Sequence, residues 1–137
     1  MGFREKSAWV MAVVLGGAGL WYLSLVVGAW RELGTAPPAW LVVPFIILVV
    51  IASIISQVVL AISDPKNAEA AADERERPII HQAGNWSGLV LGFGAVTSLL
   101  LYLGHADGNL LFHSVMGSLI VSSVAEEVLQ IILLRRA

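Results

Sequence analysis

Apolar residues occur in four long runs that are separated by shorter polar segments. The runs cover residues 8–28, 41–62, 84–103 and 110–134. Each run is close to the ~20 residues that an α-helix needs to cross the hydrocarbon core of a bilayer. Backbone amides in hydrocarbon must form their hydrogen bonds within the protein, which leaves helices or closed barrels. Apolar and polar residues do not alternate in these runs as they do in barrel strands, so each run predicts a transmembrane helix. We therefore expect an all-α membrane protein whose residues 1–137 form a single domain with four transmembrane helices.

Composition supports this expectation and excludes several classes of protein. Hydrophobic residues make up 58% of the chain and charged residues 13%, whereas a soluble domain has about a quarter charged residues. This balance excludes a soluble globular enzyme and a disordered chain. The formal net charge of −2 argues against a cationic nucleic-acid binder, so no direct nucleic-acid partner is expected. The chain has no cysteine, which excludes disulfides and thiolate metal sites.

Basic residues predict the orientation of the chain in the membrane. All but one of the eight Lys and Arg residues lie before the first run, between the second and third runs, or after the fourth run. The exception, Arg31, lies between the first two runs. Cytoplasmic segments of membrane proteins carry the excess of Lys and Arg. We therefore expect both termini and a linker at residues 63–83 to face the cytoplasm. The protein is expected to lie in the inner (plasma) membrane.

The two halves of the chain resemble each other. Val14-Leu15-Gly16 in the first run matches Val90-Leu91-Gly92 in the third. Ser56-Gln57-Val58 in the second run occupies the place of Glu126-Glu127-Val128 in the fourth. In-order matches of this kind predict two tandem two-helix hairpins in the same orientation, related by an axis along the membrane normal. The alternative is chance similarity among helices rich in Gly, Leu and Val.

Glycines mark the first and third runs as packing helices. Gly16 and Gly19 lie in the first run, and Gly88 and Gly92 in the third have the Gly-x-x-x-Gly spacing. Small residues let helix backbones approach closely in lipid, where the hydrophobic drive is absent. We interpret these positions as packing seams within the bundle or between copies.

The fourth run carries a polar stripe within the membrane. The residues of this stripe recur at helical spacing, which places them on one face of the helix. They are Ser122, Ser123, Glu126, Glu127 and Gln130. Gln57 and Ser53 lie at the corresponding depth of the second run. A charged carboxylate near mid-bilayer costs roughly 2.5–3.5 kcal/mol. At least one of the Glu126 and Glu127 side chains is therefore expected to be protonated, paired or hydrated. Three interpretations remain open: a proton or cation coupling site, hydrogen-bonded packing with the second run or pairing with Arg75 or Arg77, and docking of a partner membrane protein.

The turn between the third and fourth runs contains His105, Asp107 and His113. A metal site needs several converging ligands with a satisfied outer shell, and this set is too sparse for one, so we expect no metal. Asn109 is expected to cap the fourth helix, and His113 to face the bundle with one hydrogen-bond partner. The chain has no phosphate loop and no nucleophile elbow, so we expect neither an enzyme nor a cofactor.

The linker has a charged segment whose central residues are Asp73, Glu74, Arg75 and Arg77. Residues 67–77 are expected to form a surface helix, and Pro78 to begin a new one. The segment Asp73-Glu74-Arg75-Glu76-Arg77-Pro78-Ile79 resembles the Asp-Glu-Arg-x-Arg-x-Ile signature of a group of small four-helix bacterial inner-membrane proteins, apart from Pro78. The resemblance implies a bacterial inner membrane and a regulatory partner. The segment is interpreted as a docking motif for a cytoplasmic partner or as a solvated collar at the membrane surface.

Two functions follow from these features. In the first, the protein acts without catalysis, through assembly with itself or with another membrane or cytoplasmic protein, in a regulatory role. In the second, it is a small proton- or cation-coupled transporter or channel that uses Glu126 and Glu127.

Overall fold

The computed structural model describes residues 2–66, 74 and 76–136, and this part of the chain is almost entirely helical. The four long α-helices are each long and apolar enough to cross a membrane, in agreement with the prediction from the apolar runs. A short 3-10 helix precedes the second of them. The elements are α1 (Phe3–Leu33), η1 (Ala39–Leu41), α2 (Val42–Ser63), α4 (Glu76–His105) and α5 (Gly108–Arg136).

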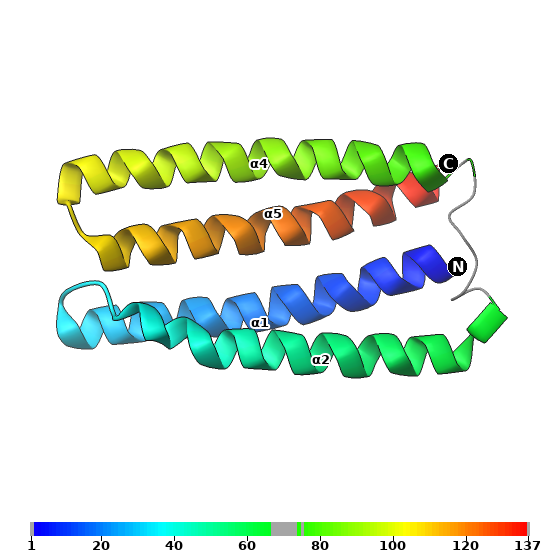
Figure 1. Ribbon diagram of the computed structural model, residues 1–137, viewed down its shortest axis with the longest axis horizontal. Coiled ribbons are helices and arrows are strands. Elements are labelled where there is room, and N and C mark those ends of the chain that lie inside the picture. Colours follow the sequence, from blue (N-terminus) through cyan, green and yellow to red (C-terminus); the bar gives the residue numbers. More distant parts are fainter. Residues whose placement is uncertain (1, 67–73, 75, 137) are drawn as a thin grey trace.

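The helices lie side by side along one axis (Figure 1). α1 and α5 pack against each other at the centre, α4 packs on α5, and α2 packs on α1. Both termini lie at one end of this bundle, and we call it the terminal end, because it holds the start of α1 and the last turn of α5. The opposite end holds residues 34–41 and the short connection between α4 and α5, and we call it the turn end.

Local chemistry explains where the helices stop. α1 ends at Gly34, whose φ of 72° is favourable for glycine and lets its N–H bond to the carbonyl of Trp30 at 2.8 Å. α2 ends at Ser63, before Asp64 and Pro65. Residue 65 is a proline, which favours extended backbone at the residue before it.

The helix α4 begins earlier than the third apolar run. It starts at Glu76, so residues 76–83 of the expected linker continue into the same helix as the membrane segment. Pro78 is its third residue rather than its first, which corrects the expected start. The first turn still tolerates proline because N–H groups there have no partner within the helix. Of the expected surface helix at 67–77, residues 67–73 and 75 lie outside the described residues, and Arg77 belongs to α4.

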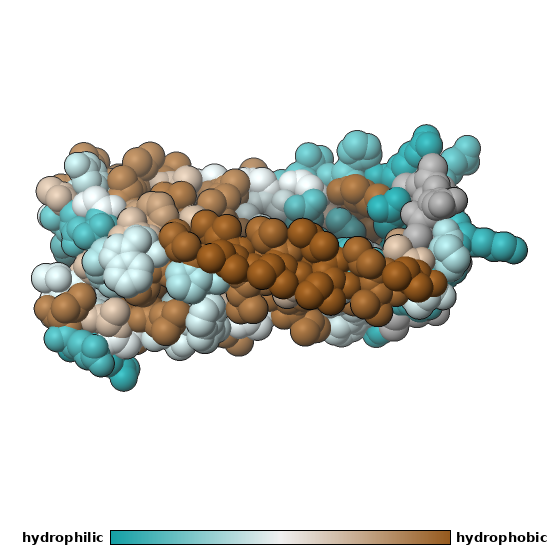
Figure 2. All heavy atoms as spheres, turned by 60° about the horizontal axis from the view of Figure 1, so that its bottom comes forward, coloured by the Kyte–Doolittle hydropathy of each residue, from teal (hydrophilic) through white to brown (hydrophobic). Residues whose placement is uncertain are grey.

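The hydrophobic core lies toward the turn end, where α1, α2 and α5 meet. Tyr22 is completely buried, and its ring centroid is 5.2 Å from that of Phe45 on α2. The remaining buried members of the core are Ala18, Val26, Val42 and Ile120. The outer surfaces of α2 and α4 are largely exposed and apolar (Figure 2 shows the hydrophobic surface along α2). Such surfaces suit contact with lipid chains, which are as apolar as the side chains themselves.

Ion pairs connect three helices at the terminal end. Arg135 Nε donates to Glu5 Oε1 at 2.6 Å, which joins α5 to α1. Arg4 Nε lies 3.8 Å from Glu76 Oε2, which joins α1 to α4. The Arg135 guanidinium also stands 5.6 Å from the centre of the Trp9 ring. Partly exposed pairs at a helix end contribute about 0–1 kcal/mol each, so they define the relative positions of the helix ends more than they stabilise the bundle.

Candidate functional site

A buried polar network joins α1, α5 and the connection before α2. The Tyr22 hydroxyl and His113 Nδ1 are hydrogen-bonded, and His113 Nε2 lies 2.9 Å from the carbonyl oxygen of Pro37. Tyr22 and Pro37 are fully buried, and His113 is buried as well. The ring of Phe112 meets the His113 ring edge-on, with centroids 5.6 Å apart. The network therefore holds the 34–38 connection against the core.

The chemistry of these groups determines the direction of both hydrogen bonds. A carbonyl oxygen only accepts, so His113 Nε2 must carry the proton that it donates to Pro37. In the neutral imidazole Nδ1 is then an acceptor, and the Tyr22 hydroxyl donates to it. Every polar atom of the pair is satisfied in this arrangement, as buried groups require.

This network confirms that His113 faces the bundle, and it gives the side chain two partners where one was expected. The other members of the turn cluster have different roles. His105 is exposed, and Asp107 Oδ1 accepts from the backbone N–H of Asn109 at 3.0 Å and of Leu110 at 3.4 Å. Asp107, not Asn109, therefore caps α5, which corrects the expected cap. Within the described residues no group of three ligand side chains converges on one point.

The polar stripe of α5 is divided between two neighbouring helices. A Cβ placed on Gly84 would lie 3.9 Å from Glu126 Oε1, so the Glu126 carboxylate faces α4. Glu127 follows Ile120 by two helical turns and so shares its side of α5, which faces Gly19 of α1. Both carboxylates are half-buried. Across residues 2–66, 74 and 76–136, no hydrogen bond or ion pair reaches either one.

Of the remaining polar residues of α5, Ser122 bonds within its own helix, and the polar residues of α2 meet α1. Ser122 Oγ donates to the Leu119 carbonyl at 3.0 Å, and Ser123 and Gln130 are half-buried on α5. On α2, Gln57 Oε1 accepts from Ser7 Oγ of α1 at 3.2 Å. Two buried atoms in this region, Ser53 Oγ and Gln57 Nε2, have no partner among the described residues. The structure thus places Gln57 and Ser53 at the α1–α2 seam.

Two glycines allow close approach of helices, and three others do not contact a neighbouring helix. A Cβ on Gly19 would lie 2.6 Å from Ile120 Cγ2, and one on Gly94 would lie 2.6 Å from Ser118 Cβ. At Gly16, Gly88 and Gly92 no atom of another segment that the structure describes lies within 4 Å of such a Cβ. The central α1–α5 contact and the α4–α5 contact therefore pass over Gly19 and Gly94, and the Gly88-x-x-x-Gly92 face of α4 is open.

The charged segment before α4 is described only in part. Glu74 is exposed, and Arg77 is exposed in the first turn of α4. Asp73 and Arg75 lie outside the described residues. The docking motif built on these four positions stays a prediction.

A comparison of the chain with family models, with curated proteins and with solved structures finds no match. Function must therefore be argued from the residues themselves. Sequence reasoning did not find Tyr22, Pro37 or the Gly94–Ser118 contact. Tyr22 and Gly94 lie inside apolar runs, where nothing in the pattern distinguishes the side that faces a neighbouring helix.

Proposed function

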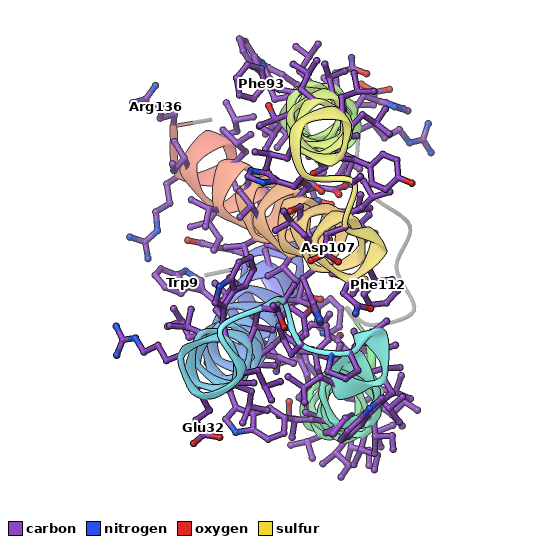
Figure 3. The ribbon with its side chains drawn as sticks, turned by 90° about the vertical axis from the view of Figure 1, so that its left-hand side faces the viewer. Trp9, Glu32, Phe93, Asp107, Phe112 and Arg136 are labelled. Atoms are coloured by element: carbon purple, nitrogen blue, oxygen red, sulfur yellow. The ribbon has the colours of Figure 1, made fainter. Side chains whose placement is uncertain are left out.

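We propose that this protein is a non-enzymatic, multi-pass membrane protein that acts by assembling through α4 with a second copy of itself. The observation that carries the proposal is the open face of α4 at Gly88 and Gly92, where no atom of another described segment lies within 4 Å of an added Cβ. Phe93, beside this face, is 78% exposed and points away from α5 (Figure 3).

The α4 face has the features of a helix-packing seam in lipid. Gly88 and Gly92 are one turn apart, so together they form a notch in an otherwise bulky surface. Leu89, which is 67% exposed, flanks the notch. Close backbone approach at such a notch lets two helices gain van der Waals contact that lipid does not supply. The α4 helix lies at the edge of the bundle, so a partner has access to it.

The proposal includes an orientation and an internal symmetry. Both termini are proposed to face the cytoplasm of a bacterial cell, with the chain in the inner membrane and two tandem hairpins built from α1–α2 and α4–α5. Its support is that both termini lie at the terminal end, and that among the described residues Arg31, in the last turn of α1, is the one Lys or Arg residue at the turn end. The charged segment before α4 would then offer a cytoplasmic partner a docking site, in a regulatory role.

The test changes the notch without touching the rest of the chain. Gly88→Ile plus Gly92→Ile adds side chains where no neighbour is present, so the single chain should keep its fold and lose its self-association. The measurement is the protein mass in mild detergent by light scattering, together with cross-linking through a Leu89→Cys variant in membranes. Gly28→Ile on α1, which also has nothing within 4 Å, is the matched control. A notch variant that keeps the oligomeric mass of the unmodified chain would disprove the proposal.

A second candidate function is favoured by the two carboxylates of α5. Ionisable residues inside membrane spans commonly mark proton or ion pathways, and Glu126 and Glu127 have no cationic partner among the described residues. In proteoliposomes with a pH-sensitive dye, Glu126→Gln plus Glu127→Gln should abolish proton or cation flux. Flux that persists unchanged in this variant, or no flux in the unmodified protein, would eliminate the candidate.

A further inference from the structure

A groove runs between α1 and α5 on the surface of the bundle. It is open to the outside, has a volume of about 420 Å³ and is lined by apolar residues and glycines. On α1 it passes over Gly16, which adds no side chain to fill it, and borders Gly19, where Ile120 of α5 comes close. On α5 it passes over Val121 and Val128. No charged or hydrogen-bonding side chain enters it, so its contents must be apolar.

Basic and aromatic side chains lie in line with this groove toward the terminal end. Trp9 precedes Gly16 by two helical turns, and Arg135 follows Val128 by two turns, so each continues the stripe of residues that lines the groove. Two turns correspond to ~10 Å along the axis. The Arg135 guanidinium stands 5.6 Å from the Trp9 ring centre, and Arg136 is on the same side of the bundle as Trp9 (Figure 3).

We propose that an anionic phospholipid binds here, with one acyl chain in the α1–α5 groove and its phosphate at Arg135 and Arg136. The depths agree with this arrangement. The groove starts ~10 Å from Arg135, and half of the hydrocarbon core is ~15 Å thick, so an acyl chain that descends from a headgroup at the arginines reaches it. Tryptophan favours the headgroup layer, and basic pockets between transmembrane helices bind anionic lipid headgroups.

Arg135 can bind a phosphate without giving up its contact with α1. Its Nε donates to Glu5 Oε1, and a guanidinium has five N–H donors, so the terminal N–H groups remain for phosphate oxygens. Within the described residues Arg136 makes no ion pair, which adds uncompensated positive charge at the same site.

A second copy of the chain suits this groove less well than a lipid. A copy in the same membrane orientation would bring its own Arg135 and Arg136 to the same depth, and like charges would meet. A phosphate supplies the opposite charge. The groove also lies on α1 and α5, away from the Gly88–Gly92 face of α4, so this inference is independent of the proposed assembly.

Native mass spectrometry of the purified full chain tests the site, with phosphatidylglycerol and phosphatidylcholine as probes. The unmodified protein should retain phosphatidylglycerol in preference to phosphatidylcholine. Each arginine near a headgroup contributes about fivefold in affinity, so Arg136→Gln should weaken phosphatidylglycerol binding about fivefold. Arg135→Gln plus Arg136→Gln should reduce it to the level of phosphatidylcholine. Gly16→Leu places a side chain in the groove from a position whose added Cβ meets no described atom within 4 Å, and it should weaken the binding of both lipids.

Matched controls separate the site from general effects on the protein. Arg31→Gln removes a charge at the opposite end, and Gly28→Leu adds the same side chain to α1 where nothing lies within 4 Å; neither should change lipid binding. Equal retention of both lipids by the unmodified chain, or phosphatidylglycerol affinity that is unchanged by Arg136→Gln or by Gly16→Leu, would overturn the proposal. So would a Gly16→Leu variant that loses oligomeric mass and keeps its lipid, because the groove would then be a contact between copies.

Discussion

At the scale of single residues, His113 connects parts of the chain that are far apart in sequence. Its two ring nitrogens bond Tyr22 of α1 and the Pro37 carbonyl of the connection before α2. A polar group buried in an apolar region is costly when it loses its partner, because water cannot replace the lost bond. The three groups therefore depend on one another, and the position of the connection depends on the tautomer of one imidazole.

Tyr22→Phe tests this dependence with a minimal change. The substitution keeps the ring that packs on Phe45 and removes only the hydroxyl that donates to His113 Nδ1. We expect the free energy of unfolding to fall by about 1–2 kcal/mol, since a buried acceptor loses its donor but membrane hydrogen bonds are individually modest. Unfolding in mixed micelles, followed by circular dichroism, measures it. Tyr102→Phe, at an exposed tyrosine, is the control and should be neutral.

The cap of α5 offers a second test at this scale. Asp107 Oδ1 accepts from two backbone N–H groups of the first turn, so Asp107→Ala should destabilise the protein by about 1 kcal/mol. Asn109→Ala should cost less than half as much in the same unfolding assay, because the Asn109 side chain makes no capping bond. Equal losses in the two variants would show that both side chains contribute to the cap.

These residues show what the sequence can and cannot predict at this scale. An inward-facing His113 is predictable because an imidazole near the start of an apolar helix needs a polar partner. Its partners are not, since Tyr22 lies within an apolar run and Pro37 in a connection whose path follows no periodicity. Asp107 and Asn109 are both good capping residues, two positions apart, and only the observed start of α5 at Gly108 decides between them.

At the scale of helices, glycine spacing indicates a smooth face, while the register of neighbouring helices decides where that face makes contact. The Gly88-x-x-x-Gly92 motif is the clearest of its kind in the sequence, yet it is open within the chain. The close α4–α5 contact instead lies two residues further along, where Gly94 meets Ser118. Small residues occur on more than one side of α4, so the pattern alone could not assign the seam.

An exchange of small residues tests the Gly94–Ser118 contact. A Cβ on Gly94 would lie 2.6 Å from Ser118 Cβ but 3.5 Å from the backbone Cα of Ser118. Gly94→Ala should therefore destabilise the helix pair by about 1–3 kcal/mol through overpacking. Adding Ser118→Gly should recover much of the loss, because the new methyl group then meets only backbone at an ordinary van der Waals distance. Gly28→Ala, at a position of α1 where no described atom lies within 4 Å of the added Cβ, should stay within about 0.5 kcal/mol of the unmodified chain. A double variant no more stable than Gly94→Ala alone would contradict this account.

At the scale of the whole molecule, the four apolar helices were predictable and the distribution of their polar groups was not. Length and hydropathy define a membrane span because the bilayer thickness does. The polar stripe of α5 appeared to be one face, but its residues divide between α4 and α1 once α5 lies at the centre of the bundle. The neighbours of a central helix depend on the order in which the helices pack. The periodicity of residues within one helix carries no information about that order.

The orientation of the bundle remains a prediction, and single cysteines test it directly because the native chain has none. Thr35 and Glu74 are both exposed, and Thr35 lies at the turn end. With both termini in the cytoplasm, a membrane-impermeant maleimide should label Thr35→Cys in intact cells and Glu74→Cys only after permeabilisation. The physical reason is that Lys and Arg resist transfer across the membrane and so keep the terminal end inside. Labelling of Glu74→Cys in intact cells would reverse the orientation, and labelling of both positions from one side would mean that the chain crosses the membrane fewer times than its helices allow.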